Sequence, residues 1–155
     1  MNITNLLKPD CILVDVTASN KRELLEKIAA QGAICSGLHQ KEIFDALLQR
    51  ERLGTTGTGD GVAIPHSRFP NLKQIYGVFV RLSQPVDFEA VDEKPVDLIF
   101  TLLAPETAGA DHLHALSQVA KVFKDEAAKI QLRSSKTASA IQTVFADVLG
   151  RANAA

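Results

Sequence analysis

The sequence lacks the features that mark membrane, secreted and nucleic-acid-binding proteins. No apolar run among its 155 residues is long enough to span a bilayer, and no basic segment at the N-terminus leads into a long apolar stretch. The 17 basic and 18 acidic side chains leave a net charge of -1, which provides no overall attraction to nucleic acid or anionic lipid. We therefore expect a cytoplasmic protein that neither inserts into a membrane nor binds nucleic acid.

Cysteine is scarce, and several signatures of catalysis are missing. Cys11 and Cys35 form neither a C-x-x-C pair nor a disulfide framework, so we expect both to be reduced and buried. There is no P-loop, no Gly-x-Gly-x-x-Gly, no Gly-x-Ser-x-Gly elbow and no His-Glu-x-x-His. These absences disfavour a nucleotide site, a serine hydrolase and a metal enzyme.

The remaining composition is that of one folded domain. Hydrophobic residues make up 46% of the chain and charged residues 23%, far from the composition of a disordered protein. A chain of this length can bury one core without disulfides or metals. We expect a single domain at residues 1–150 and a frayed tail at residues 151–155.

Hydrophobic periodicity predicts strands and helices in alternation. Strands are expected at residues 11–16, 62–64, 75–82 and 96–104, and the last of these is apolar enough to be a central strand. Asn20 and Glu23 suit the start of a helix that stops near Gly32, and a second helix runs from about Gln40 to Gly54. This order of elements favours an α/β fold, a mixed β-sheet with helices packed on its faces.

Three helices are predicted in the second half of the chain, and inward-facing residues are assigned to the first and the last of them. Their inward-facing residues are expected to be Leu113, Leu116, Ala120 and Phe123 in a helix that begins near Asp111, and Ile141, Val144, Phe145 and Val148 in a helix that ends before Gly150.

His66 is the first candidate for chemistry. A neutral imidazole keeps one bare nitrogen, which can act as a nucleophile toward phosphorus. Pro65 restrains the backbone before it, and a glycine-rich segment that we expect to be a loop precedes both. Backbone N–H groups of such a loop can converge on an anion. The residues of the candidate phosphoryl-binding loop are Gly57, Thr58, Gly59 and Gly61. The alternative interpretation of His66 is a surface histidine without a role.

Arginine and a second pair of histidines offer further groups for an anion. Arg50 and Arg52 end the second helix, and a guanidinium can fork onto phosphoryl oxygens. Two residues apart on a helix, they cannot both face the loop. His112 and His114 point in different directions on a helix, so shared metal ligation is not expected, although one of them can reach an anion near the helix N-terminus.

The stretch from Arg50 to His66, RERLGTTGTGDGVAIPH, resembles the phosphorylation site of the enzyme IIA family of the bacterial phosphotransferase system. The resemblance continues through GVFV, PVDL and HLHALS and is greatest to the nitrogen-regulatory branch. It implies an α/β sandwich with a mixed sheet, and a phosphohistidine formed on His66 without a cofactor or metal. It places the family's arginine at Arg50 and the second histidine at His112. Ser67 and Arg52 stand where glycine and lysine are commoner in the family.

The resemblance also implies partners. A histidine phosphocarrier protein, of the nitrogen-type or general kind, would donate the phosphoryl group, and a transporter or kinase would be regulated in one phosphorylation state. Two alternatives stay open, a fructose- or mannitol-type transport component that donates to a IIB partner, and a binding module whose site no longer turns over. The ring nitrogen used, the regulated partner and the oligomeric state are left open by the sequence.

Overall fold

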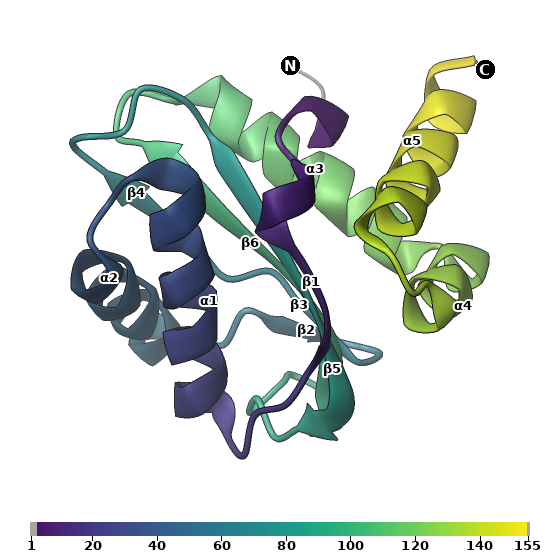
Figure 1. Cartoon of the computed structure of the whole chain (residues 1–155), viewed down its shortest axis with the longest axis horizontal. Helices are drawn as coiled ribbons and strands as arrows, with labels where there is room; N and C mark the ends of the chain where they lie inside the picture. The colour runs from purple at the N-terminus through teal and green to yellow at the C-terminus, as the bar shows by residue number, and fades with distance from the viewer. Residues whose placement is uncertain (1–2, 155) are drawn as a thin grey trace.

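The structure, a computed structural model, describes residues 3–154 and has a mixed β-sheet between two layers of helices (Figure 1). Helices α1 (Lys21–Ser36) and α2 (Gln40–Leu53) cover one face of the sheet. The other face is covered by α3 (Ala110–Lys124), α4 (Glu126–Ser134) and α5 (Ala138–Ala154). The prediction of an α/β fold with helices on both faces of a mixed sheet is confirmed.

The sheet is built around its longest hydrogen-bonded pair of strands, β5 and β6, which run antiparallel. The strand order is β1-β5-β6-β3-β2, and β4 pairs with β6 beyond the end of β3. Strand β1 is parallel to β5, and both β3 and β4 are parallel to β6. The strands are β1 (Ile12–Val16), β2 (Gly57–Gly59), β3 (Val62–Ala63), β4 (His66–Phe69), β5 (Tyr76–Val86) and β6 (Val96–Pro105).

Strand β6 separates two hydrophobic cores. Its side chains alternate between the faces, so that Leu98, Phe100 and Leu102 pack with the α3–α5 layer. Ile99 and Leu103 pack with the α1–α2 layer. All five side chains are fully buried, which explains the nearly continuous apolar run in the sequence.

The first helix begins as predicted and ends later than predicted. The Asn20 side chain accepts a hydrogen bond from the Glu23 N–H at 2.9 Å, which caps α1. The helix continues through Gly32 to Gly37, whose left-handed backbone ends it. A Cβ on Gly32 would lie 3.2 Å from Leu103 and 3.3 Å from Ile43. Gly32 therefore allows close packing of α1 and is not a stop signal.

The glycine-rich segment is more ordered than the loop predicted for it. Residues Gly57–Gly59 form β2, which pairs antiparallel with β3. The buried carboxylate of Glu51 accepts a hydrogen bond from the Thr56 N–H at 3.1 Å, and Lys21 approaches the same carboxylate at 2.9 Å. These contacts hold the segment at its start, and Lys21 is the one of these residues that is distant in the sequence.

The C-terminal helix also extends further than predicted. Helix α5 continues through Gly150 and Arg151 to Ala154, while Ala155 lies outside the described residues. Its predicted inward face is correct, because Ile141, Val144, Phe145 and Val148 are all buried. Among the described residues, no helix combines the length and apolarity needed to cross a membrane.

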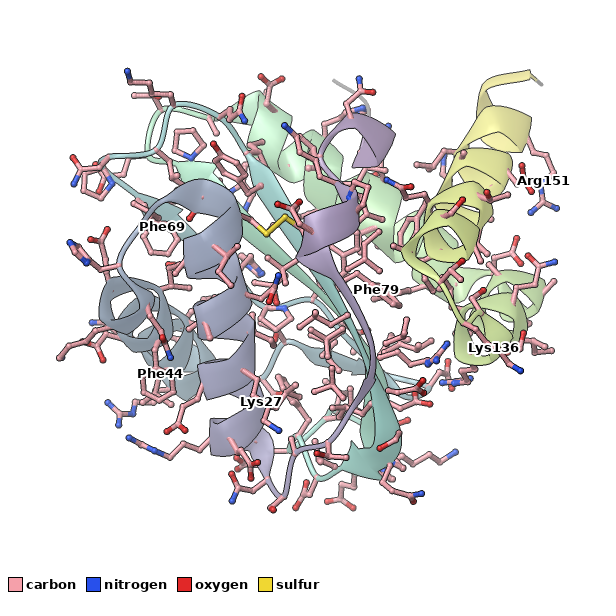
Figure 2. All side chains as sticks on the ribbon, in the orientation of Figure 1. Lys27, Phe44, Phe69, Phe79, Lys136 and Arg151 are labelled. Atoms are coloured by element: carbon pink, nitrogen blue, oxygen red, sulfur yellow. A yellow bond between two sulfur atoms is a disulfide. The ribbon has the colours of Figure 1, made fainter. Side chains whose placement is uncertain are left out.

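The two cysteines are joined in a disulfide rather than left as free thiols. Cys11 ends the short 3-10 helix η2 (Pro9–Cys11), which follows η1 (Ile3–Asn5), and Cys35 lies near the end of α1. Figure 2 shows the bond, in yellow, between these two segments. Cys11 is buried and Cys35 is half-buried. The prediction of two reduced, buried cysteines is therefore wrong, because the fold brings their Cα atoms to 6.1 Å.

Candidate functional site

His66 begins β4 at a break between two strands that pair with the same neighbour. Strand β3 pairs with β6 at Leu98 and Ile99, and β4 resumes the pairing with His66 opposite Leu102. Pro65 lies in the break because it has no N–H to donate, while its carbonyl accepts from the Leu102 N–H at 2.9 Å. The two strand segments thus fix the backbone on both sides of the histidine.

The His66 ring is oriented by a hydrogen bond to its own backbone. Its Nδ1 lies 2.9 Å from the carbonyl oxygen of Ile64. A carbonyl oxygen only accepts hydrogen bonds, so Nδ1 carries the proton in this contact. In the neutral ring, Nε2 then holds the free lone pair. With this tautomer, the half-buried imidazole can act as a nucleophile at Nε2.

His112 reaches the same site from α3 on the opposite side of the cleft. Its ring centroid lies 5.6 Å from that of His66, with the rings at 69°. The predicted inward face of α3 is correct for Phe123, which is buried, and for Leu116 and Ala120, which pack against the core, but it is wrong for Leu113, which is 66% exposed. The first buried residues of the helix are His112, Ala115 and Val119. His112 therefore lies on the inner face of α3, toward β4.

The surroundings of His112 differ at its two ring nitrogens. The Arg68 Nε–H donates to Nδ1 at 3.2 Å. The Nε2 atom is buried and has no hydrogen-bond partner among the described residues. Burial, helped by the nearby His66 and Arg68, lowers the pKa of His112 from its usual value of 6.5. The ring is therefore held neutral at neutral pH.

Of the two arginines at the end of α2, Arg50 reaches the site. Arg50 lines the cleft and is half-buried, and its Nη1–H donates to the Gly54 carbonyl at 2.8 Å. Arg52 is exposed and is not among the cleft-lining residues. Since α2 packs against β4, the end of the helix brings one guanidinium beside His66.

These side chains surround a cleft of about 320 Å³. Two arginines and no carboxylates are found among its described lining residues, so the local charge favours an anion. Leu113 and Leu116 add an apolar part to the wall, which suits contact with a protein surface. The lining residues are Arg50, His66, Ser67, Arg68, His112, Leu113 and Leu116.

The predicted phosphoryl-binding loop does not line this cleft. Strand β3 meets β6 three to four residues before His66 does, about 10 to 13 Å away along the strand. A Cβ on Gly57 would lie 2.9 Å from that of Ala90, and Gly61 lies against Arg133. The N–H of Asp60 already donates to Asp92. Gly57, Thr58, Gly59 and Gly61 therefore take part in strand pairing and close packing outside this cleft, and their binding of the phosphoryl group stays a prediction.

His114 is separated from the site by its position on the helix. It is exposed and does not line the cleft, whereas His112 is buried. In the described part of the chain, the one cluster with metal-ligating groups is Asp10, Cys11 and Cys35. The two sulfurs of that cluster form the disulfide, and no histidine belongs to it.

Arg68 and Ser67 are cleft residues that sequence reasoning did not identify. The missing signal was β4 itself, which follows a proline and is only four residues long. In a strand, residues i and i+2 share a face, so an arginine two residues after His66 would have been expected beside it.

The chain is similar in sequence to known proteins over nearly its whole length. The family model described as "Phosphoenolpyruvate-dependent sugar phosphotransferase system, EIIA 2" matches residues 5–148. A nitrogen regulatory protein of Bradyrhizobium diazoefficiens is 48% identical over 146 residues, which cover 94% of this chain and 95% of that protein. A nitrogen regulatory protein of Pseudomonas aeruginosa is 38% identical over 151 residues, which cover 96% and 97%.

Solved structures agree with the sequence comparisons. The crystal structure of the nitrogen regulatory protein IIA-Ntr from Neisseria meningitidis matches with a TM-score of 0.89 and 38% identity, covering 92% of this chain and 98% of that one. The resemblance inferred from the residues around His66 is thus confirmed across the whole fold. The chain belongs to the EIIA 2 family of the phosphoenolpyruvate-dependent sugar phosphotransferase system.

Proposed function

We propose that the chain is a phosphoryl carrier of nitrogen regulation that accepts a phosphoryl group on Nε2 of His66. The observation that carries the proposal is the hydrogen bond between His66 Nδ1 and the Ile64 carbonyl, which leaves Nε2 as the nucleophilic nitrogen. The donor is a phosphohistidine on a histidine phosphocarrier protein, as the family membership suggests.

The transfer needs no further reactant. The Nε2 lone pair of His66 forms the new bond to phosphorus, and the electron pair of the carrier's P–N bond returns to the carrier's imidazole. The His66 ring gains positive charge as the bond forms. Its Nδ1–H donates to the Ile64 carbonyl oxygen, and that interaction strengthens as the charge develops.

Three groups of the cleft support the transferring phosphoryl group. Arg50 uses Nη1–H on the Gly54 carbonyl and keeps other N–H donors for phosphoryl oxygens. Arg68 adds positive charge to the cleft, and His112 adds a ring nitrogen that has no hydrogen-bond partner among the described residues. Positioned donors of this kind stabilise the charge on the equatorial oxygens in phosphoryl transfer.

A regulatory role is supported by the names and coverage of the relatives. Nitrogen regulatory proteins align with at least 94% of this chain in the two cases described above. Phosphorylation adds negative charge inside a cleft with an apolar wall, which alters the surface that a partner meets. We propose that a transporter or kinase binds with different affinity to the two phosphorylation states.

Intact-protein mass spectrometry after incubation with phosphoenolpyruvate and a phosphocarrier chain tests the proposal. We expect the mass of one phosphoryl group to be added to the wild-type chain and to be absent from His66→Ala. The exposed histidines His39 and His114 provide matched controls, and their alanine variants should be labelled like the wild type. A label that persists on His66→Ala would remove this residue from the role.

The same labelled protein separates the regulatory role from the sugar-transport role. We expect it to keep its phosphoryl group when mixed with a fructose-type IIB protein. Rapid transfer to IIB would favour the transport role. A chain that takes up no label from any carrier would favour a binding module whose site does not turn over.

A further inference from the structure

Arg68 is the charged cleft residue that neither the motifs nor the resemblance identified. It lies on β4 two residues after His66, so the two side chains leave the strand on the same face. His112 packs over that face, with its ring edge-on to His66 and its Nδ1 bonded to Arg68. The same face of β4 thus carries His66, the proposed acceptor, and Arg68, the hydrogen-bond partner of His112.

The contact between Arg68 and His112 determines where the proton of the second histidine lies. A guanidinium N–H can only donate, so the Nδ1 atom that it meets at 3.2 Å must offer a lone pair. A neutral imidazole with a bare Nδ1 carries its proton on Nε2. Buried polar groups are nearly always hydrogen-bonded, yet Nε2 of His112 has no partner in the described part of the chain.

We propose that Arg68 is a positioning residue that holds His112 in its Nε2–H tautomer, so that His112 donates a hydrogen bond to the phosphoryl group carried by His66. This inference rests on the proposed function. The two rings are then opposite tautomers. His66 has its proton on Nδ1 and a lone pair on Nε2, whereas His112 has its proton on Nε2 and a lone pair on Nδ1. One Nε2 accepts the phosphoryl group and the other donates to its oxygens.

The opposite tautomer would work against the reaction. With the proton on Nδ1, His112 would present a buried lone pair to the phosphoryl oxygens, which are themselves acceptors, and would clash with the Arg68 N–H. Arg68 prevents this tautomer of His112, because its N–H groups can only donate and it lies on the same strand as His66. Arg68 thereby acts through His112 in addition to supplying positive charge to the cleft.

Nitrogen-15 NMR of the histidine rings tests the proposal on the unphosphorylated protein at about pH 8, well above the ordinary imidazole pKa of about 6.5. We expect wild-type His112 to show a protonated Nε2 and an unprotonated Nδ1. In Arg68→Met nothing selects this tautomer, so the two nitrogens should shift toward a mixture. Arg68→Lys, which keeps a donor, should restore the wild-type pattern at least in part.

Arg22 supplies a matched control, because it is an exposed arginine on α1 outside the cleft. Arg22→Met should leave both His112 nitrogens unchanged. A wild-type His112 with its proton on Nδ1 would overturn the proposal, as would an Arg68→Met protein with an unchanged tautomer. Because this measurement needs no phosphoryl donor, its result is independent of whether His66 is labelled.

The kinetic consequence is measured separately. We expect Arg68→Met to slow phosphoryl transfer about tenfold, the usual effect of losing a residue that orients a functional histidine, while labelling of His66 still goes to completion. Arg68→Lys should recover most of the rate. A transfer rate in Arg68→Met equal to that of the wild type would contradict the role of the tautomer in transfer.

Discussion

Replacing Arg50 with alanine is the sharpest test of the proposed role of the cleft. Arg52 provides the comparison, because it carries the same guanidinium group on the same helix but does not line the cleft. Arg50 is half-buried, lines the cleft and is held by the Gly54 carbonyl, whereas Arg52 is exposed and lies outside the lining. Both variants lose one positive charge from the last turn of α2. A difference between them therefore reports the position of the guanidinium and not the net charge.

The expected size of the effect follows from the contacts. Removing one positioned donor from a site that stabilises developing negative charge typically slows catalysis by about 100-fold or more, equal to about 2.7 kcal/mol. Arg50→Ala also loses the hydrogen bond to Gly54, which contributes about 1 kcal/mol to stability. That loss is too small to unfold an ordinary domain. We expect Arg52→Ala to change the transfer rate less than twofold, as is usual for an exposed charge.

Single-turnover transfer from a phosphorylated carrier, stopped by quenching and read by intact mass, gives the two rates. Urea unfolding of both variants checks that each remains folded under the assay conditions. The reasoning would be refuted by equal slowing in Arg50→Ala and Arg52→Ala, and equally by a wild-type rate in Arg50→Ala.

Two further predictions concern stability. Burial lowers the pKa of His112, so the unfolded state binds more protons than the folded state as the pH falls below about 6.5, and the folded state loses stability in that range. In a plot of unfolding free energy against pH, His112→Gln should therefore reduce the slope below about pH 6.5. His114→Gln, at an exposed position, should leave this slope unchanged. Equal slopes in wild type and His112→Gln would contradict the assignment. Alanine at Gly150, where a Cβ meets none of the described atoms within 4 Å, should give a protein about 1 kcal/mol more stable than alanine at Gly32, where the Cβ would press on Leu103. Urea unfolding measures the difference, and equal stabilities would contradict the packing argument.

Local signals in the sequence were sufficient for the architecture and for proposing His66 as the phosphoryl acceptor. Helix starts such as Asn20 depend on side chains within a few residues, and β6 is recognised by an apolar run that needs cover on both faces. His66 was identified from the chemistry of imidazole and from the residues before it. The resemblance then selected Arg50 and His112, which the structure brings into one cleft.

Several predictions failed where a distant contact outweighs a local preference. Gly32 reads as a helix end, but α1 continues because the missing side chain lets Leu103 pack against it. The glycines before His66 were expected to form a loop, but the pairing of β3 with β6, a strand distant in the sequence, holds β3 in the sheet, and residues Gly57–Gly59 pair with β3 as strand β2. Cys11 and Cys35, 24 residues apart, meet through the docking of η2 on α1.

The sequence by itself determined the chemistry that is possible here, because residue types and their short-range spacing settle which elements form and which side chain can be the nucleophile. Only the tertiary structure decided the states of the groups in the cleft. The bare nitrogen of His66 depends on the Ile64 carbonyl, and the environment of His112 depends on burial and on Arg68, 44 residues away. Protonation and tautomer are properties of three-dimensional surroundings, and these arise only when β4, α2 and α3 come together.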